Sequence, residues 1–551
     1  MFLKRIMSLL VTLSFISQAL VVVDTDSYSS VVVEDSSILE ELSEQNGART
    51  GEPSNLSIPF TSMKTGTGDC SCFGQTMVLG DKLIFGGKST NASYDPPYSS
   101  GNEGRMALYI TDGTISGTTS LNKTIGSYDE DIEETQFNHI EHIVMNDVLY
   151  FNFDDGKDET GKELWRTDGT EDGTYLVKDI REGADDPGTG VSSYIRDFVE
   201  YDNHIYFSAT NDDGPTELWK SDGTEEGTVQ ISNLSLGVYY LTVFNDEIYF
   251  NGLNEDNARV LWKSDGTGEG TVKVNDSAYI SGIPFALGDH LYFKGYSGDH
   301  GGELWRTDGT DEGTVLVKDI RPGSSSSDIN NLRVEGDYIY FTAWDGTADQ
   351  YENLWKSDGT AEGTVKISNL EKMYFGGGMI FLSESQAVIQ MNDEYGDDEY
   401  GREPYVFDLT GVEEPRILKD FNPSENGQYI DRFVLGANGV FYFAASNGQE
   451  FNNNQVLWRS DGTDNGTWMI DYLADTQTAG GTRFVTRLGE DLLYGAQSVT
   501  KKEEGKWRPA CGISCGHGYD LWKLSDIGYP SNSAPTPSYP LFSSVDSANL
   551  A

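Results

Sequence analysis

Acidic side chains are the most numerous candidates for chemistry in this sequence, and many of them fall in short stretches between apolar runs. Two such stretches contain Asp154, Asp155, Asp158, Asp397 and Asp398. Carboxylate oxygens are the ligands that Ca2+ takes in proteins, and two carboxylates at a suitable separation can hydrolyse a glycosidic bond. We therefore predict these five residues as metal ligands, with Ca2+ as the candidate cofactor. Glycoside chemistry and a merely solvated acidic surface are the alternatives.

Histidine and nucleophile patterns indicate no catalytic centre. His139 and His142 are three residues apart in an apparent strand, so their side chains should lie on opposite faces of a sheet rather than share a metal. The sequence contains no Gly-x-Ser-x-Gly string, no His-Glu-x-x-His string and no phosphate-binding glycine loop. No catalytic residue is predicted.

Four cysteines lie towards the two ends of the chain: Cys70, Cys72, Cys511 and Cys515. In an oxidising compartment we expect them to form disulfides, either within each pair or between the two ends. Together with His517 they could instead bind zinc.

The charge balance excludes some classes of partner. The chain has 38 Lys and Arg against 89 Asp and Glu, a formal net charge of −51. Such a charge repels phosphate backbones and anionic lipid, so nucleic acid is excluded as a partner. Divalent cations, cationic surfaces or solubility in salty water remain as explanations.

The N-terminus has the layout of a secretory signal peptide, because Lys4 and Arg5 precede an apolar run and a small-residue cleavage site. We assign residues 1–19 to a signal peptide, 20–55 to a flexible acidic linker and 526–551 to a Ser/Pro-rich disordered tail. No second apolar stretch of transmembrane length follows. The protein is expected to be secreted or held at the cell surface, with N-glycans, if its source is eukaryotic, at Asn55, Asn91, Asn122, Asn233, Asn275 and Asn465.

One string organises the rest of the chain. The sequence from Leu164 to Thr174 reads Leu-Trp-Arg-Thr-Asp-Gly-Thr-Glu-Asp-Gly-Thr, and close or looser copies begin at residues 108, 218, 261, 304, 354, 404, 457 and 521. Self-similarity at a period of roughly fifty residues indicates a repeat architecture. Nine repeat units are counted.

Each unit predicts a four-stranded antiparallel meander. In residues 194–234, strand-like runs alternate with turns at Asp202-Asn203 and Asp222-Gly223. The second run of a unit is apolar at consecutive positions, as in Ile205-Tyr206-Phe207, so both faces of its sheet must be covered. We predict an all-β fold, a single β-propeller over residues 56–525 with nine blades, or eight as the alternative. The segment from Leu56 to Met63 should complete the last blade.

Turn chemistry explains the repeated Asp-Gly-Thr. The Asp side chain can accept hydrogen bonds from the turn backbone, and the Gly supplies a positive φ. By strand parity these turns all lie on one face, and the acidic variable loops lie on the opposite face. Variable loops on a rigid scaffold are where binding usually occurs, so the ligand is predicted on the acidic loop face.

The string is distinctive enough to carry a resemblance: the chain resembles the ELWxxDGT-repeat proteins, which are exported repeat proteins. Glu163 to Thr170 and Glu303 to Thr310 carry the whole signature, whereas Glu403-Pro404-Tyr405 and Leu521-Trp522 depart from it. The resemblance implies a propeller and a role at the surface or in the matrix. We expect a binding or adhesion scaffold for an extracellular polysaccharide or protein ligand, with an extracellular carbohydrate-active enzyme as the alternative.

Overall fold

The computed structural model of the 551-residue chain describes most of its strands and the turns between them. The described residues are 76–88, 106–114, 117–124, 140–154, 160–186, 189–211, 214–232, 236–276, 278–347, 352–369, 373–393, 402–419, 421, 431–436, 439–446, 455–469, 485–489 and 491–496, with short strands at 22–23, 31–32, 58–59, 501–503, 506–508 and 520–524.

All secondary-structure elements of these residues are β-strands, and the strands pair antiparallel. They form seven four-stranded sheets, one eight-stranded sheet and three two-stranded sheets. The eight-stranded sheet consists of two meanders joined by the single pair Val260↔Tyr279. The predicted all-β class and four-stranded antiparallel units are confirmed. Within the same residues no helix is long and apolar enough to cross a membrane.

We number the meanders in chain order, each by its four strands from first to fourth. Meander 1 is β4 (Met77–Leu79), β5 (Lys82–Lys88), β6 (Met106–Thr111) and β7 (Thr119–Thr124). Meander 2 is β8 (His142–Met145), β9 (Val148–Phe153), β10 (Glu163–Thr167) and β11 (Tyr175–Lys178). Meander 3 is β14 (Arg196–Tyr201), β15 (His204–Ala209), β16 (Glu217–Ser221) and β17 (Val229–Gln230).

The next three follow the same plan. Meander 4 is β18 (Tyr239–Phe244), β19 (Glu247–Leu253), β20 (Arg259–Ser264) and β21 (Val272–Lys273). Meander 5 is β22 (Tyr279–Leu287), β23 (His290–Ser297), β24 (Gly301–Thr307) and β25 (Val315–Lys318). Meander 6 is β26 (Asn330–Glu335), β27 (Tyr338–Ala343), β28 (Asn353–Ser357) and β29 (Val365–Lys366).

Meander 7 is regular although its repeat string departs from the signature. It is β30 (Met373–Ser383), β31 (Gln386–Asp393), β32 (Arg402–Asp408) and β33 (Arg416–Ile417). Meander 8 is β34 (Asp431–Leu435), β35 (Phe441–Ser446), β36 (Gln455–Ser460) and β37 (Trp468–Met469).

The ninth sheet combines the two ends of the chain. Its order is β3–β42–β39–β38, with β38 (Val485–Leu488), β39 (Asp491–Ala496) and β42 (Asp520–Leu524). The N-terminal strand β3 (Ile58–Pro59) pairs with β42 through Ile58↔Lys523 and Pro59↔Trp522. The prediction that an N-terminal piece completes the last unit is confirmed at these residues.

Three further sheets are two-stranded. In the predicted linker, β1 (Val22–Val23) pairs with β2 (Val31–Val32). Two hairpins lie in connections: β12 (Ala184–Asp186) with β13 (Thr189–Gly190), and β40 (Lys501–Glu503) with β41 (Lys506–Arg508).

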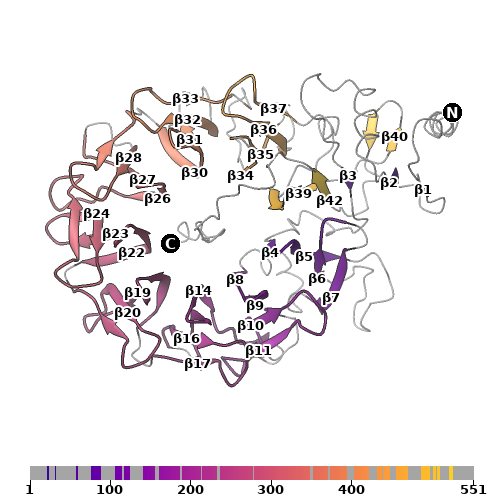
Figure 1. Cartoon of the computed structure of the whole chain (residues 1–551), viewed down its shortest axis with the longest axis horizontal. Helices are drawn as coiled ribbons and strands as arrows, with labels where there is room; N and C mark the ends of the chain where they lie inside the picture. The colour runs from indigo at the N-terminus through magenta and orange to yellow at the C-terminus, as the bar shows by residue number, and fades with distance from the viewer. Residues whose placement is uncertain are drawn as a thin grey trace.

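The sheets follow one another in chain order around a common centre, and the first strand of a meander lies nearest that centre (Figure 1). Because neighbouring strands run antiparallel, the connections between strands 1 and 2 and between strands 3 and 4 leave at one edge of each meander. We call this the turn edge. The connections between strands 2 and 3, and from one meander to the next, leave at the opposite edge, which we call the loop edge.

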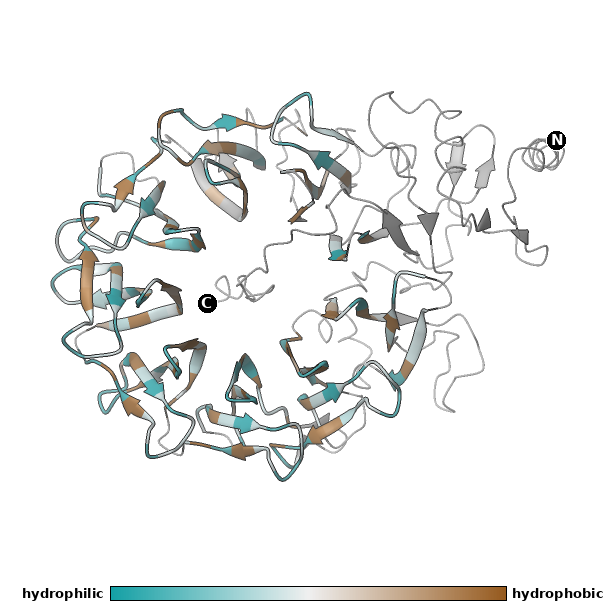
Figure 2. Ribbon diagram, viewed as in Figure 1, coloured by the Kyte–Doolittle hydropathy of each residue, from teal (hydrophilic) through white to brown (hydrophobic). Residues whose placement is uncertain are grey.

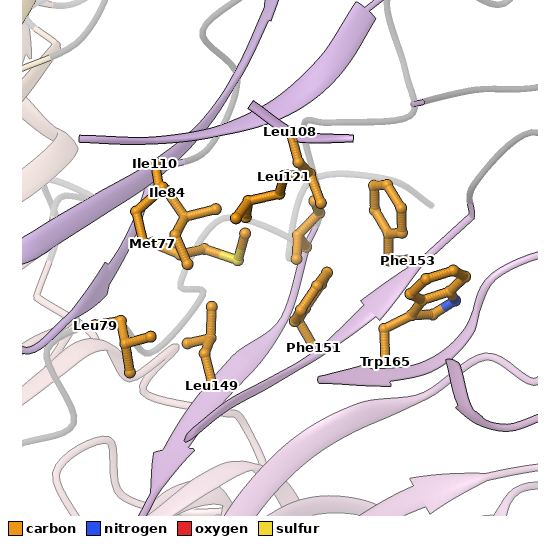
Figure 3. Packing of buried hydrophobic residues seen from close by; sticks show 11 residues of the cluster. Met77, Leu79, Ile84, Leu108, Ile110, Leu121, Leu149, Phe151, Phe153 and Trp165 are labelled. Atoms are coloured by element: carbon orange, nitrogen blue, oxygen red, sulfur yellow. The ribbon is translucent and has the colours of Figure 1, made fainter. Parts of the chain in front are cut away.

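The hydrophobic core is divided into clusters that each span two successive meanders. Apolar segments accordingly recur around the whole arrangement (Figure 2). In one cluster, Met77, Ile84 and Leu108 of meander 1 face Phe151 and Trp165 of meander 2 (Figure 3). The same construction links meanders 2 and 3, 3 and 4, 4 and 5, 5 and 6, 6 and 7, and 7 and 8. The repeated Trp therefore packs between meanders, as predicted.

The Asp-Gly-Thr turn is stabilised by a hydrogen-bond network that the sequence analysis anticipated. In meander 2 the Asp168 carboxylate accepts from the backbone nitrogen of Thr170 at 2.9 Å and from its hydroxyl at 2.7 Å. Gly169 has a φ of 87°. Corresponding bonds occur around Asp112, Asp222, Asp265, Asp308, Asp358 and Asp461.

The glycine of this turn also touches the preceding meander. A Cβ added at Gly223, Gly266, Gly309 or Gly359 would overlap the hydroxyl of Tyr150, Tyr206, Tyr249 or Tyr292 respectively. Each tyrosine belongs to the second strand of the meander before. The glycine is therefore required both for its positive φ and for this close approach.

We predict that Trp165→Ala and Trp305→Ala each lower the free energy of unfolding by about 3 to 5 kcal/mol, because both rings are buried between meanders. Urea denaturation followed by circular dichroism measures the loss. Val412→Ala is the control, since that side chain is 84% exposed. A change near zero for both tryptophans would contradict the role of these rings as core.

Candidate ligand-binding edge

The predicted metal ligands lie largely outside the described residues. Asp154 follows β9 at the loop edge and is half-buried, whereas Asp155, Asp158, Asp397 and Asp398 are not among the residues described. No group of three or more His, Cys, Asp or Glu that could hold a metal ion occurs among the described residues. Cys70, Cys72, Cys511 and Cys515 also lie outside them.

Three of the predicted glycosylation sites can be located. Asn122 in β7 and Asn465 in a turn are exposed. Asn275 is buried, and its side-chain nitrogen donates to Asp311. A glycan on Asn275 would require this side chain to leave its place, so Asn122 and Asn465 are the accessible positions of the three. Asn55, Asn91 and Asn233 lie outside the described residues.

Two tyrosines at the loop edge are unusually exposed for large side chains. Tyr194, just before β14, is 54% exposed, and Tyr279, the first residue of β22, is 47% exposed. The two occupy corresponding positions, each one residue before a buried isoleucine, Ile195 or Ile280. The sequence analysis missed both, although a tyrosine recurring at one repeat position was the available signal.

Tyr194 adopts a backbone conformation that suits it poorly. Its φ is 52°, whereas the corresponding positions of meanders 4 and 6 hold Gly237 at 58° and Asp328 at 52°. Glycine and aspartate enter this region at low cost, but a bulky residue there is an outlier. The left-handed conformation is therefore shared by meanders 3, 4 and 6, and the exposed ring of Tyr194 at this position needs an explanation beyond folding.

Basic side chains stack on aromatic rings at the same edge. Arg181 lies over Tyr194 at 5.9 Å from the ring centroid, Arg259 over Tyr239 at 4.4 Å, and Lys294 over Tyr296 at 5.5 Å. Arg321 lies over Trp344 at 3.8 Å. The edge that the sequence predicts as acidic thus carries four cation–aromatic pairs among its described residues.

Buried glutamates fix the backbone that carries two of these arginines. The Glu directly before the Leu-Trp of the repeated string, which we call the Glu of the string, is fully buried at Glu163 and Glu303. Its carboxylate accepts from the backbone nitrogen of Ile180 at 2.8 Å in meander 2 and of Ile320 at 3.0 Å in meander 5. Burial raises the pKa of Glu163 to about 8 and that of Glu303 to about 7, against an ordinary value of 4.5. Asp179 and Asp319 nearby add repulsion, while the hydrogen bonds oppose the shift.

One pair of carboxylates is brought together that the sequence did not reveal. Glu141 of meander 2 accepts a hydrogen bond from the backbone nitrogen of Asp197 in meander 3. Burial, followed by repulsion from Asp197, raises the pKa of Glu141 to about 7. Burial also raises the pKa of Asp197, against a hydrogen bond from the Tyr240 backbone. Asp197 lies in the first strand, with a φ of 59°.

The Glu141–Asp197 pair is the arrangement closest to acid–base chemistry among the described residues. A carboxyl that stays protonated near neutral pH could act as a general acid. One Glu141 oxygen, however, is occupied by the Asp197 amide, which indicates a structural link between meanders 2 and 3. The nearby His142 has a pKa lowered by burial, and His139 lies outside the described residues.

Comparison with solved structures shows only distant likeness. A puromycin-hydrolyzing peptidase from Mycobacterium tuberculosis matches 80% of this chain at 13% sequence identity, with a TM-score of 0.37 and 61% of its own length covered. A puromycin hydrolase matches 70% of this chain at 12% identity and a TM-score of 0.35, over 60% of its length. Prolyl oligopeptidase B from Galerina marginata matches 65% at 12% identity and a TM-score of 0.37, over 54% of its length.

This chain therefore spans less than two thirds of the length of these structures. At such scores their activities give no basis for assigning one here. No protein-family model matches the sequence, and no curated protein matches it.

The buried glutamates generate a pH prediction. Because their pKa values are raised on folding, the stability that they contribute is complete below about pH 4.5 and is lost as the pH rises through about 7 for Glu303 and about 8 for Glu163. We expect Glu163→Gln, which mimics the protonated carboxyl, to flatten the fall in the free energy of unfolding between pH 5 and pH 8. Urea titrations across this range measure it, with the exposed Glu171→Gln as control. If the free energy of unfolding of Glu163→Gln falls with pH as steeply as that of the unaltered protein, the raised pKa of Glu163 is contradicted.

Proposed function

We propose that the meanders form one closed nine-bladed β-propeller and that the protein belongs with the exported ELWxxDGT-repeat proteins. The pairing of β3 with β42 supports closure, because it uses the N-terminal segment to complete the ninth sheet. The clusters shared by successive meanders support blade packing. On this proposal the signal peptide directs the chain to the cell surface or the surrounding medium.

The proposed activity is binding: the protein is an adhesion scaffold that holds an extracellular polysaccharide at its loop edge. The observation that carries this proposal is the group of aromatic rings there: Tyr194 and Tyr279 are exposed, and Tyr194 also lies under Arg181 and has a costly backbone conformation. The C–H face of a sugar packs on an aromatic ring, and a guanidinium donates to its hydroxyls.

Charge favours a neutral polysaccharide over an acidic one. A net charge of −51 repels polyanions at long range. A polycation would be attracted by the overall field but would meet the arginines at the loop edge. A neutral polysaccharide meets neither the long-range repulsion nor the repulsion from the arginines. Its binding should therefore depend little on salt concentration.

The rival function is a carbohydrate-active enzyme, and the Glu141–Asp197 pair is the observation that favours it. An enzyme would need Glu141 to reach a substrate oxygen, whereas its hydrogen bond to Asp197 supports a structural role. Hydrolysis that disappears in Glu141→Gln while the fold is retained would favour the enzyme.

Closure can be tested through the cysteines. We predict at least one disulfide between the N-terminal pair, Cys70 and Cys72, and the C-terminal pair, Cys511 and Cys515, because a closed ring places the two ends side by side. Peptide mapping under non-reducing conditions identifies the bridges. Bridges confined within each pair, or four free thiols, would remove this support.

Binding can be tested on the full chain with soluble neutral glucan, mannan and galactan, and with alginate as the acidic comparison. We expect retention of at least one neutral polymer in affinity electrophoresis, without release of reducing sugar. Tyr194→Ala and Tyr279→Ala should each weaken retention about tenfold, since each removes one stacking platform.

Tyr175→Ala is the matched control for these variants. Tyr175 is 42% exposed and also lies beside an arginine, but it begins the fourth strand β11 rather than standing at the loop edge. Equal losses from Tyr175→Ala and Tyr194→Ala, or retention of alginate alone, would count against the neutral-polysaccharide proposal. Binding of a protein instead of any glycan would replace it.

A further inference from the structure

The connection that follows the fourth strand is built in the same way in meanders 2 and 5. We call these connections the Arg181 loop (residues 179–183 and 191–194) and the Arg321 loop (residues 319–323 and 325–328). Each packs against a glycine of positive φ, Gly161 at 59° and Gly301 at 64°. A Cβ on either glycine would meet the loop backbone, at Val191 in one case and Ser325 in the other. Both loops therefore close over the start of the third strand.

The hydrogen bonds of the two loops correspond one to one. The Lys162 nitrogen donates to the Ser192 hydroxyl at 3.0 Å, as the Gly302 nitrogen does to Ser326. The hydroxyls of Ser193 and Ser327 donate to the carbonyls of Lys162 and Gly302 at 3.2 and 3.0 Å. The buried Glu163 and Glu303 hold the nitrogens of Ile180 and Ile320.

Each loop presents its arginine in the same setting. Arg181 donates through Nη1 to the Ser192 carbonyl at 3.4 Å, and Arg321 donates through Nη1 to the Ser326 carbonyl at 3.0 Å. A hydrogen bond to a backbone carbonyl thus holds each guanidinium group in place. This lowers the conformational entropy that each would lose on binding a ligand.

The aromatic ring that stacks on the arginine comes from a different repeat position in each of the two loops. In the Arg181 loop the ring belongs to Tyr194, and the corresponding residue of the other loop is Asp328. Over Arg321 lies Trp344, which follows the second strand of meander 6. Simple repetition of a motif would keep the ring at one position. Here an equivalent guanidinium receives a ring from two unrelated positions. This indicates that the arginine–aromatic pair itself has a use.

We propose that the Arg181 loop and the Arg321 loop are two equivalent sugar-binding subsites that grip one neutral polysaccharide chain at two points. In each subsite the ring packs on a sugar face and the guanidinium donates to neighbouring hydroxyls. This inference rests on the proposed polysaccharide binding and adds its stoichiometry and residues. With meanders 3, 4 and 5 between the subsites, a short oligosaccharide fills one subsite at a time, whereas a polymer engages both and gains avidity.

The test compares polymer and oligosaccharide on the same variants. Neutral glucan, mannan and galactan are each titrated by calorimetry as the polymer and as the tetrasaccharide, against the unaltered protein, Arg181→Ala, Arg321→Ala and the double variant. For the bound sugar we expect two tetrasaccharides per unaltered chain, one per single variant and none for the double variant. Polymer affinity should fall roughly 100-fold in either single variant, because avidity is lost.

Arg166→Ala is the matched control, since Arg166 lies over Tyr175 at 5.2 Å from the ring centroid but belongs to the turn edge and to neither loop. Thermal unfolding of every variant separates loss of binding from loss of fold. Should an arginine variant unfold, Trp344→Tyr and Tyr194→Phe, which alter or trim the rings, provide a second comparison of the two subsites.

The outcomes separate the two proposals. Failure of every glycan to bind the unaltered protein overturns the proposed function itself. Binding of one tetrasaccharide per chain, or polymer affinity that Arg181→Ala and Arg321→Ala leave unchanged, overturns the paired subsites while the scaffold function survives.

Discussion

The structure depends on one constraint: a four-stranded meander has two apolar faces and can cover neither by itself. Second strands such as Leu149-Tyr150-Phe151 are buried along their whole central stretch. Each face is therefore buried against the next meander, and the hydrophobic clusters belong to pairs of meanders. An arrangement that leaves an apolar face uncovered costs roughly 25 cal/mol for each Å2 exposed, which strongly favours the stacking of one meander on the next.

The constraint acts differently on the two edges of the meanders. At the turn edge, a tyrosine hydroxyl from one meander fits against a side-chain-free glycine of the next, as Tyr249 does at Gly309. Any side chain added there disturbs the packing between meanders, so the Asp-Gly-Thr string varies little. At the loop edge the connections differ in length and composition, and in meanders 2 and 5 the buried Glu of the string links them to the core. Residues at that edge are therefore free to change without loss of the fold.

The sequence predicted the fold better than the site, and the reason is the range of the interactions. Strands, turns and the role of Asp168 follow from residues within one repeat, and a copy in each unit reinforces the signal. Glu141 and Asp197 are 56 residues apart and meet only because two meanders stack. Arg321 and Trp344 likewise come from successive meanders. The acidic loops were conspicuous in the sequence, whereas two weaker recurrences beside them were overlooked: the tyrosine at Tyr194 and Tyr279, and the Val-Lys-Asp-Ile-Arg string that ends at Arg181 and Arg321.

The buried glutamate explains how a core motif can serve a surface site. Burying a carboxyl group completely costs free energy unless the group is hydrogen-bonded or protonated. Glu303 repays part of this cost by accepting from the backbone nitrogens of both Ile320 and Arg321, at 3.0 and 3.4 Å. The same hydrogen bonds set the direction in which the backbone at Arg321 leaves the core. Where the string starts with another residue, as at Val260 in meander 4, this anchor is missing. The Glu of the string is therefore a positioning residue for the loop edge, and in meander 7 Glu403 accepts from the backbone nitrogen of Phe421 in the same way.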